Sequence, residues 1–477
     1  MDFYAKDCEL VLGLVAPVGV NLGDVQNRLE SIFRQFRYDV DFVHLSEVSK
    51  SVFGNDGPPL QDEVSRLDAA MKQGTEAREK YKRGDIYALL AIDAISSKRD
   101  SENDRPKPVK RKVHVIRSLK HAEEVETLRQ VYGRGFFLLG VSASINTRRN
   151  YLENIKGVKG HQLEKIIKKD DKEGVPLGQQ TRSVFQLADA FVTTDDTERL
   201  SSQLSRIIDL LFSKPVEPPT AEEYAMFMSY AASLRSADLS RQVGAVVMNS
   251  HKDILSTGAN DVPRMDGGLY WPGKDDQRDY VKGFDSNERE KEKIIDDVLQ
   301  SLFPDGCDDS ELLRGKLKGS RLMDLTEFGR AVHAEMESLL QAARNGVSVR
   351  GCSLYTTTYP CHNCAKHIIA AGIKEVVYIE PYPKSYAKQL HDDCMESEEA
   401  ESEDKVVFRQ FVGVGPRRFV DLFSTRLSSG RKVTRKVDGG LQVWDRNDAE
   451  LRVPMTPLSY LESEMKLVKE FSELTRS

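Results

Sequence analysis

Three side chains in the second half of the sequence have the types and the spacing of a metal site. His333 precedes a Cys-x-x-Cys pair formed by Cys361 and Cys364. Imidazole nitrogen and thiolate sulfur are preferred ligands of zinc. A structural zinc site usually has four protein ligands, so three ligands leave one position for water, as in a catalytic zinc site. The sequence therefore predicts zinc as the cofactor, with a catalytic role.

Glu335 lies two residues after the predicted histidine ligand. A carboxylate in this position can take a proton from a water molecule on the metal and pass it to a substrate. The combination H-x-E followed by P-C-x-x-C is typical of zinc deaminases of nucleobases, in which the glutamate is an acid and base and not a ligand. Zinc lowers the pKa of its bound water to about 7, which supplies hydroxide near neutral pH. We therefore assign the proton transfers of a deamination to Glu335.

Simpler interpretations of the Cys-x-x-Cys pair exist. The pair could be a redox centre, or it could be half of a closed structural zinc site in which His362 or His367 provides another ligand. Both halves of the deaminase signature are present and in the right order, which favours the catalytic interpretation.

The elements that must position these residues are two helices and two strands. Apolar residues at three- and four-residue spacing predict a helix that begins at His333 and ends before Gly346. Gly351 to Thr358 and Lys374 to Glu380 are predicted strands, and Cys361 to Ala371 is a predicted helix between them. The cysteines would then lie at a helix N-terminus, where the helix dipole favours thiolates.

Residues 9–212 alternate strand-like and helix-like segments, as in a parallel α/β sheet. Ser213 to Thr220 contains three prolines and is typical of an extended linker. We therefore expect two domains, residues 1–215 and residues 216–477. The predicted strands of the first are Leu10 to Ala16, Tyr38 to Leu45, Tyr87 to Ile92, Val113 to Ile116, Phe136 to Val141 and Ala190 to Thr194, and its predicted helices include Val25 to Phe36, Glu123 to Tyr132 and Glu198 to Phe212.

Gly13 and Gly19 flank the turn after the first predicted strand, where a phosphate-binding loop would lie. The P-loop motif has four residues between its glycines and then Lys and Ser or Thr, whereas this turn has five and continues with Val20 and Asn21. Backbone N–H groups at a helix N-terminus can bind phosphate without the lysine, but phosphoryl transfer is not expected. Gly13 and Gly19 are candidate nucleotide-binding residues, and a purely structural domain is the alternative.

The composition is that of a soluble protein with a full hydrophobic core. Of 477 residues, 39% are hydrophobic and 30% are charged, and the net charge is −6. This negative balance argues against a broad nucleic-acid surface and favours free nucleotides as substrates. The six cysteines are too sparse for a disulfide scaffold, and no apolar run approaches transmembrane length. We expect a cytoplasmic protein with no membrane partner.

The segment from Tyr224 to about Phe423 resembles the deoxycytidylate deaminase family. Besides the zinc signature, the resemblance lies in a first core strand from Arg241 to Val246 and in the loop from Gly258 to Pro263. It implies that Asn260 of this loop holds the sugar of the substrate. It also implies that the backbone amide of Ala334 contacts the base.

The first domain looks like a relative of nucleotide kinases, and the whole chain resembles the bacterial antiviral dCTP/dCMP deaminases. The kinase resemblance lies in Ser118 to Val125, Arg148-Arg149 and Ala188 to Val192. The resemblance of the whole chain implies an α/β protein with an N-terminal parallel-sheet, P-loop kinase-like domain and a C-terminal cytidine deaminase-like α/β/α domain. The implied substrates are deoxycytidine nucleotides, which would be depleted during phage infection. A regulatory nucleotide, RNA or a phage-derived trigger would act at the first domain of a homo-oligomer.

Residues 264–330 form an insertion that a minimal deaminase domain does not need. It begins with Tyr270-Trp271-Pro272 and continues into a charged segment with a helical pattern. It is a candidate lid or oligomer contact, or else a peripheral excursion. Two other functions remain open for the chain as a whole, namely a polynucleotide cytidine or adenosine deaminase and a nucleotide-sensing regulatory protein with a structural zinc.

Overall fold

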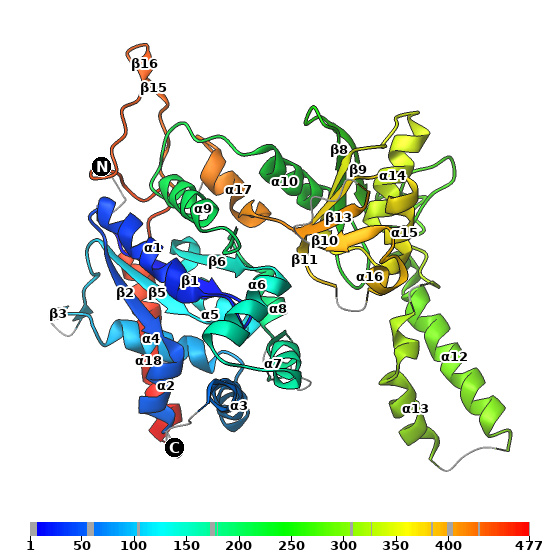
Figure 1. The fold of residues 1–477 in the computed structure, drawn as a ribbon, viewed down its shortest axis with the longest axis horizontal. Helices are drawn as coiled ribbons and strands as arrows, with labels where there is room; N and C mark the ends of the chain where they lie inside the picture. Colours follow the sequence, from blue (N-terminus) through cyan, green and yellow to red (C-terminus); the bar gives the residue numbers. More distant parts are fainter. Residues whose placement is uncertain are drawn as a thin grey trace. The chain divides into compact units, whose positions relative to one another are not determined.

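The structure of this chain is a computed structural model that divides into two compact units (Figure 1). The first unit consists of Met1–Glu223 with Val412–Ser477, and the second unit is Tyr224–Phe411. The residues that the structure describes are 7–54, 62–102, 105–171, 177–178, 180–305, 309–325, 327–382, 385–397, 404–427 and 430–476.

A six-stranded sheet forms the centre of the first unit. Its strand order is β14-β7-β6-β1-β5-β2, and all neighbouring strands are parallel except β14, which pairs with β7 in the antiparallel direction. Every residue of β1 is buried, as expected for a parallel strand that is covered on both faces. The strands are β1 (Leu10–Val15), β2 (Asp39–His44), β5 (Lys112–Arg117), β6 (Phe136–Ser142), β7 (Ala190–Thr193) and β14 (Gly413–Val414).

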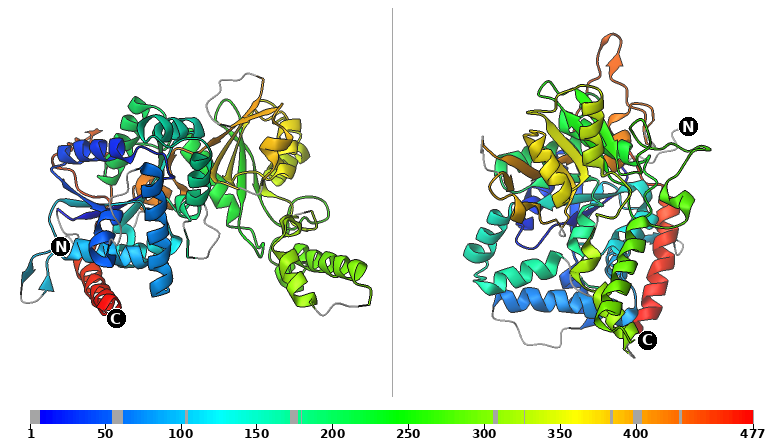
Figure 2. Two further views of the ribbon diagram at one scale, coloured as in Figure 1. Left: turned by 60° about the horizontal axis from the view of Figure 1, so that its bottom comes forward. Right: turned by 90° about the vertical axis from the view of Figure 1, so that its right-hand side faces the viewer.

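Helices cover both faces of this sheet (Figure 2). Leu10, Leu12 and Leu14 alternate along β1 and share a core cluster with apolar residues of α1 and α9, so these two helices cover one face. On the other face, α4 packs against α5 and α18. The helices are α1 (Leu22–Gln35), α2 (Leu45–Phe53), α3 (Glu63–Tyr81), α4 (Ile86–Ser96), α5 (Ala122–Tyr132), α6 (Ile145–Asn150), α7 (His161–Asp171), α8 (Thr181–Phe185), α9 (Thr197–Leu211), α17 (Pro416–Phe423) and α18 (Pro457–Arg476).

One predicted strand of the first unit is wrong. Tyr87 to Ile92 lies inside helix α4, whereas the other five predicted strands and the three predicted helices are confirmed. A short, continuous apolar run is compatible with a buried strand and with a buried helix. Helix α4 packs against α2, α5 and α18, so nearly all of its surface is covered and it has no polar face to reveal a helical period.

The predicted division into residues 1–215 and 216–477 is also corrected. The first part of the first unit ends at Glu223 and not at residue 215. The segment Val412–Ser477 also belongs to the first unit, although the prediction places it in the second domain. The segment of residues 406–414 is therefore split between the two units. Its first part is β13 (Val406–Gln410) of the second unit, and its end is β14, which adds to β7.

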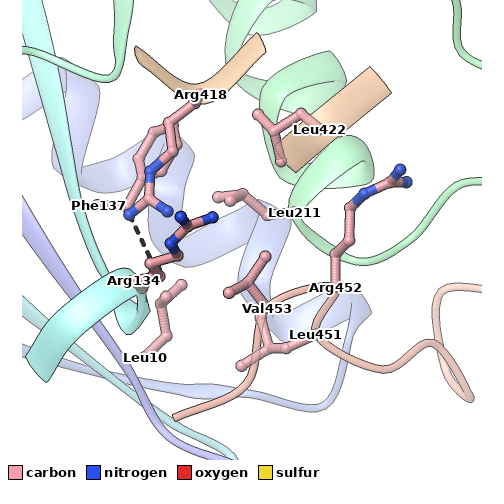
Figure 3. A pocket seen from close by; sticks show the side chains of 9 residues that line it. All are labelled: Leu10, Arg134, Phe137, Leu211, Arg418, Leu422, Leu451, Arg452 and Val453. Carbon is pink, nitrogen blue, oxygen red and sulfur yellow. Dashed lines mark hydrogen bonds between the residues drawn. The ribbon is translucent and has the colours of Figure 1, made fainter. Parts of the chain in front are cut away.

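Packing explains why the C-terminal segment returns to the first unit. Leu451 and Val453 face side chains of β1, β6, α9 and α17 around a small cavity (Figure 3). Between them, Arg452 donates from Nε to the carbonyl oxygen of Asp421 and from Nη2 to that of Ser424, at the C-terminal end of α17. A cation at this end of a helix is favourable because the last carbonyl groups lack intrahelical donors.

A buried cluster of charged side chains joins α18 to the sheet. Arg99 donates from Nη1 to Glu9, which directly precedes β1, at 2.7 Å, and from Nε to Glu464 of α18 at 2.7 Å. His114 of β5 lies 3.0 Å from Glu9 and 3.3 Å from Asp41 of β2. The side chains of Arg99, Glu9, Glu464 and His114 are at most 1% exposed. Removing one partner of such a group leaves a buried charge uncompensated, which is costly.

We expect His114→Gln to destabilise the protein more at about pH 6 than at about pH 9. Burial alone would lower the pKa of His114, but hydrogen bonds to Asp41 and Glu9 outweigh it and raise this pKa above its usual 6.5. A raised pKa stabilises the fold below the unfolded pKa, and this contribution is lost as the pH rises through the folded pKa. Thermal unfolding of parent and variant at both pH values measures the difference, and an equal gap at the two values would contradict the assignment.

The second unit contains a mixed six-stranded sheet with the order β12-β13-β11-β10-β8-β9. β8 and β9 form an antiparallel hairpin, β8 pairs antiparallel with β10, and β10, β11, β13 and β12 are mutually parallel. Helix α14 packs against β8 and β9, and α15 connects β10 to β11. The elements are α10 (Ala221–Ser233), β8 (Gly244–Met248), β9 (Ile254–Ala259), α14 (Ala334–Arg344), β10 (Ser353–Thr358), α15 (His362–Ala370), β11 (Glu375–Glu380), α16 (Ala387–Leu390), β12 (Met395–Ser397) and β13.

The insertion at residues 264–330 is helical, as predicted. Its elements are α11 (Asp279–Lys282), α12 (Ser286–Leu302), α13 (Ser310–Lys318) and a 3-10 turn at Arg321–Asp324. Figure 1 shows α12 and α13 as a pair that projects from the sheet of the second unit. Its role as a lid or an oligomer contact stays a prediction. Among the described residues of both units, no helix has the length and apolarity that crossing a bilayer requires.

Candidate zinc site

The predicted metal ligands lie at the N-terminal ends of two neighbouring helices of the second unit. His333 is the N-cap residue of α14, and Cys361 is the N-cap residue of α15. The sulfur of Cys361 accepts a hydrogen bond from the backbone N–H of Cys364 at 3.4 Å. Because α14 and α15 pack against each other, the N-terminal ends of the two helices bring His333, Cys361 and Cys364 close together.

The three ligand atoms meet at distances that fit zinc. Nδ1 of His333 lies 3.3 Å from the sulfur of Cys361 and 3.3 Å from the sulfur of Cys364, and all three atoms lie within 4.8 Å of one another. A tetrahedral zinc with usual bond lengths separates nitrogen and sulfur ligands by about 3.5 Å. The donor set and its spacing therefore fit the predicted ion.

The alternative ligands His362 and His367 do not join this cluster. The ring of His367 lies 2.6 Å from the carbonyl oxygen of Asn363 through its Nδ1, and that of His362 faces Glu327 at 3.8 Å. The cluster among the described residues thus has three protein ligands, which leaves room in a tetrahedral site for a fourth, exchangeable one.

Hydrogen bonds within the cluster set its protonation. The side-chain hydrogen bond between Cys361 and Cys364 lowers the pKa of Cys361 to about 4 and raises the pKa of Cys364. The contact with Cys361 raises the pKa of His333 to about 9. Zinc requires both thiolates and a neutral imidazole, so its binding would release protons from this group.

Glu335 lies beside the cluster and not in it. It is the second residue of α14, is 4% exposed and accepts a hydrogen bond from the thiol of Cys364 at 3.6 Å. Burial raises the pKa of Glu335 to about 7. The carboxyl group is thus placed where it can receive and donate protons next to the predicted metal.

The predicted substrate loop adjoins the histidine ligand. β9 ends at Ala259, and Asp261 forms an isolated antiparallel bridge with Val332. The N–H of Val332 donates to the carbonyl oxygen of Asp261 at 2.9 Å, and the N–H of Asp261 donates back at 3.2 Å. These two bonds fix the loop next to His333.

Asn260 is buried and already bonded within the loop region. Its Oδ1 accepts from the N–H of Val243 at 2.7 Å, and its Nδ2 donates to the carbonyl oxygen of Arg241 at 2.8 Å. A carboxamide has two donor hydrogens and two acceptor lone pairs, so one of each remains. The sugar contact of Asn260 stays a prediction.

Gly258 is a position at which packing next to the site requires glycine, and the sequence pattern does not indicate this role. A Cβ atom there would lie 2.0 Å from the carbonyl oxygen of Ala334 and 2.6 Å from the backbone nitrogen of Ser338. Backbone therefore touches backbone where β9 meets the first turn of α14, which only glycine permits. Ala334 is fully buried at this contact. Its predicted amide contact with the base stays a prediction.

A buried ion cluster, which no local sequence pattern indicates, anchors the insertion to the substrate loop. Arg278 donates to Asp261 at 3.2 Å and to Asp276 at 2.6 Å. All three residues are at most 4% exposed. Because Asp261 follows Asn260 directly, the insertion is attached to the loop at the residue next to the predicted sugar contact.

The candidate nucleotide-binding glycines lie in the first unit. Gly13 is inside β1, where a Cβ atom would lie 2.8 Å from the ring of Phe136. Gly19 has φ +91° and packs against Arg148, whose carbonyl oxygen would lie 2.9 Å from a Cβ atom. Packing and backbone conformation account for both glycines, and their role in nucleotide binding stays a prediction.

Comparisons with known proteins concern the segment that contains the zinc cluster. Residues 219–380 match the family described as the cytidine and deoxycytidylate deaminase zinc-binding region. The deoxycytidylate deaminase of Enterobacteria phage T2 is 33% identical over 160 residues, which make up 33% of this chain and 79% of the phage protein. The human deoxycytidylate deaminase is 28% identical over 157 residues, and the chain spans 63% of the length of that protein.

A solved structure with partial similarity is that of dCMP deaminase from the cyanophage S-TIM5 in complex with dCMP and dUMP. It is 20% identical, has a TM-score of 0.25 and aligns with 41% of this chain and 100% of the cyanophage chain. The stronger findings are the match to the phage T2 protein, which covers most of that protein, and the family match over residues 219–380, which contain the predicted ligands of this chain. The chain belongs to the deoxycytidylate deaminase family.

Proposed function

We propose that this chain is a zinc-dependent hydrolase that deaminates deoxycytidine nucleotides, dCMP, dCTP or both, to the corresponding deoxyuridine nucleotides. The observation that carries the proposal is the buried cluster of His333, Cys361 and Cys364 with Glu335 beside it. Family membership supports the same chemistry.

In this proposal the protein residues hold the metal and move protons. His333, Cys361 and Cys364 would bind zinc, which supplies a Lewis acid and a water of lowered pKa when bound. Glu335 takes a proton from the attacking water and gives it to N3 of cytosine, which makes C4 more electrophilic. It then passes the second proton to the C4 amine. Ammonia leaves, and the oxygen of the water remains on C4 as the uracil carbonyl.

The substrate would be positioned by backbone and loop groups next to the ligands. The first helical N–H groups of α14 lack acceptors within the helix, so the amide of Ala334 is suited to a hydrogen bond with the base. The remaining donor and acceptor of Asn260 are suited to a sugar hydroxyl. Ala334 is the first residue of α14, and the side chain of Asn260 is held by hydrogen bonds to the backbone of Val243 and Arg241.

A substrate panel with metal analysis tests the proposed function. Full-length protein with a measured zinc content is assayed on dCMP, dCTP, single-stranded DNA and single-stranded RNA. Turnover of a free deoxycytidine nucleotide is expected, at a rate well above that on either polymer. A preference for a polymer would instead identify a polynucleotide deaminase, and bound zinc without any turnover would identify a sensor with a structural zinc.

Asn260→Ala is expected to lower kcat/KM by about 10- to 100-fold through misplacement of the substrate. Zinc content should not change, because Asn260 contacts the backbone of Arg241 and Val243 and no metal ligand. Asn249→Ala is a matched control, since this amide caps the turn between β8 and β9 by bonding to Asp253. Equal kinetics of the two variants on every nucleotide would refute the sugar contact.

We also propose that the protein depletes deoxycytidine nucleotides during phage infection and that the first unit, as a kinase-like module, controls the second. An unregulated enzyme of this kind would consume the host's own DNA precursors, so control is required. The test compares the full chain with residues 224–411 and measures cellular dCTP with and without infection. Equal depletion by both proteins, independent of infection, would contradict the regulatory role.

A fragment beginning at residue 216 is less suitable for this comparison. It would include residues 412–477, whose partners β7, Arg99 and the α4 helix lie in the first unit. The unpaired segment would expose apolar surface, so a change in activity could not be attributed to lost control.

A further inference from the structure

The first unit contains a cavity of about 350 Å³ at the carboxyl ends of three parallel strands. Its wall includes residues at the ends of these strands or directly after them, namely Ala16 after β1, His44 and Leu45 at the end of β2, and Ser118 after β5. Open α/β sheets bind ligands in this position, outside the carboxyl ends of the strands. The volume is within the range of small-molecule sites.

The turn after β1 does not offer a free anion site. The backbone N–H of Val18 donates to Oδ2 of Asp170 at 2.7 Å. Lys120 donates from Nζ to Oδ1 of Asp170 at 2.7 Å and to the carbonyl oxygen of Ala16 at 2.9 Å. Asp170 is fully buried. The carboxylate of Asp170 therefore already accepts hydrogen bonds from the backbone amide of Val18 and from Lys120, the two donors that could otherwise bind a phosphate.

Arg78 in the wall of the cavity has two guanidinium nitrogens that are not hydrogen-bonded among the described residues. It is 2% exposed, donates from Nη2 to Glu124 at 2.6 Å and lies over the ring of Tyr87 at 5.3 Å. Its Nε and Nη1 have no hydrogen-bond partner in the part of the chain that the structure describes. Buried guanidinium donors without acceptors are costly, so an acceptor group of a ligand in this cavity would be bound favourably.

Arg117, at the end of β5, also lines the cavity. It donates from Nη1 to Gln26 at 2.7 Å, and among the described residues it forms no ion pair with a carboxylate. Burial lowers the pKa of Arg117, as expected for a cation that lacks a close carboxylate. The other cations named here are paired, Lys120 with Asp170, Arg66 with Glu63 and Arg78 with Glu124, so the positive charge without a paired carboxylate is that of Arg117, and Arg78 contributes its two unbonded donors.

We propose that this cavity binds a phosphate monoester of about the size of a nucleoside monophosphate, whose phosphate is held by Arg78 and Arg117 in place of the turn after β1. Guanidinium groups match phosphate oxygens through paired N–H donors and keep their charge when buried. Leu45, Met71 and Tyr87 give the same wall apolar surface for the organic part of the ligand. The proposal does not depend on the deaminase chemistry, because every residue that it uses lies in the first unit.

Calorimetric titration of the full-length, zinc-containing protein tests this site with four probes, namely inorganic phosphate, ribose 5-phosphate, AMP and dTMP. Binding of at least one organic phosphate at one site per chain is expected. Adenosine, which lacks the phosphate, should bind at least about tenfold more weakly than AMP, because it offers no acceptor to the arginines. The order among the esters shows whether a base is required.

Two variants locate the binding. Arg117→Gln should weaken it by about tenfold or more, since one charge-assisted contact is lost. Arg78→Lys keeps the positive charge, so the carboxylate of Glu124 stays paired, but it removes the planar set of guanidinium N–H donors. We therefore expect a similar loss of affinity for the phosphate ligand. Arg34→Gln is the matched control, because Arg34 of α1 is exposed and pairs with Glu30 of the same helix. Thermal unfolding confirms that each variant is folded.

Three results would overturn the proposal. The first is the absence of binding of every probe at millimolar concentration. The second is binding of equal strength to the parent, Arg117→Gln and Arg78→Lys, which would place the ligand elsewhere in the chain. The third is adenosine binding as tight as that of AMP, which would show that the phosphate does not contact the arginines.

Discussion

Glu335→Gln is expected to lower the deamination rate by about two to four orders of magnitude while leaving zinc in place. Glutamine has nearly the same shape as glutamate, so the packing around this 4% exposed side chain should survive. It cannot take a proton from water, however, and it cannot return one to the base or to the amine. Steady-state turnover of dCMP and dCTP, together with zinc content, measures both parts of this expectation.

A matched control for this variant is Glu337→Gln on the same turn of α14. Glu337 is 5% exposed and pairs with Arg344, away from the cysteines. Its replacement should change turnover much less than that of Glu335. If Glu335→Gln retains turnover near that of the parent, the carboxylate is not the proton carrier. If it loses zinc as well, the carboxylate is needed for the metal site rather than for proton transfer alone.

Local sequence patterns predicted the zinc cluster because its geometry is local. Each ligand is tied to a helix N-terminus, where the cap fixes the backbone within a few residues of the signature. The helix predicted to begin at His333 and to end before Gly346 is α14, Ala334–Arg344. Only the approach of the two helix N-termini had to be supplied by the fold, and the packing of α14 against α15, β8 and β9 supplies it.

Contacts between residues far apart in the sequence could not be predicted in this way. The pairing of β14 with β7 joins residues that are separated by more than two hundred positions, and nothing in the short sequence of β14 specifies a partner. The carboxylate of Asp170 at the amide of Val18 is a similar case, since an aspartate in a charged helix is usually solvated. Such contacts depend on packing of whole elements and not on a local period.

The internal bonds of Asn260 show the limit of carrying over a role from a resemblance. The residue was identified by its position in a loop motif, and the loop does lie next to His333. Its amide nevertheless joins the start of β8 to the loop, so its loss would disturb the loop even if it never touched a sugar. For this reason the test of Asn260 needs zinc content and the split between kcat and KM, and not turnover alone.

Cys361→Ser and Cys364→Ser are each expected to lose zinc and activity together, unlike Glu335→Gln. Serine oxygen is a poor zinc ligand because it remains protonated near neutral pH, so only two protein ligands would remain. Metal content should fall from about one zinc per chain to almost none, and the melting temperature should no longer respond to added zinc. Cys352→Ser is the control, since Cys352 is a buried cysteine of the same core outside the cluster.

Serine is a sharper replacement than alanine at Cys361, because this residue has two tasks. Its sulfur is a predicted ligand, and it also caps α15 by accepting from the N–H of Cys364. Serine is a favoured N-cap residue and can keep the cap, whereas alanine would remove it. Loss of zinc in Cys361→Ser with an unchanged helical signal would therefore isolate ligation from capping. If Cys361→Ser and Cys364→Ser both kept stoichiometric zinc, the cluster would not be the metal site, and the proposed chemistry at Glu335 would lose its basis.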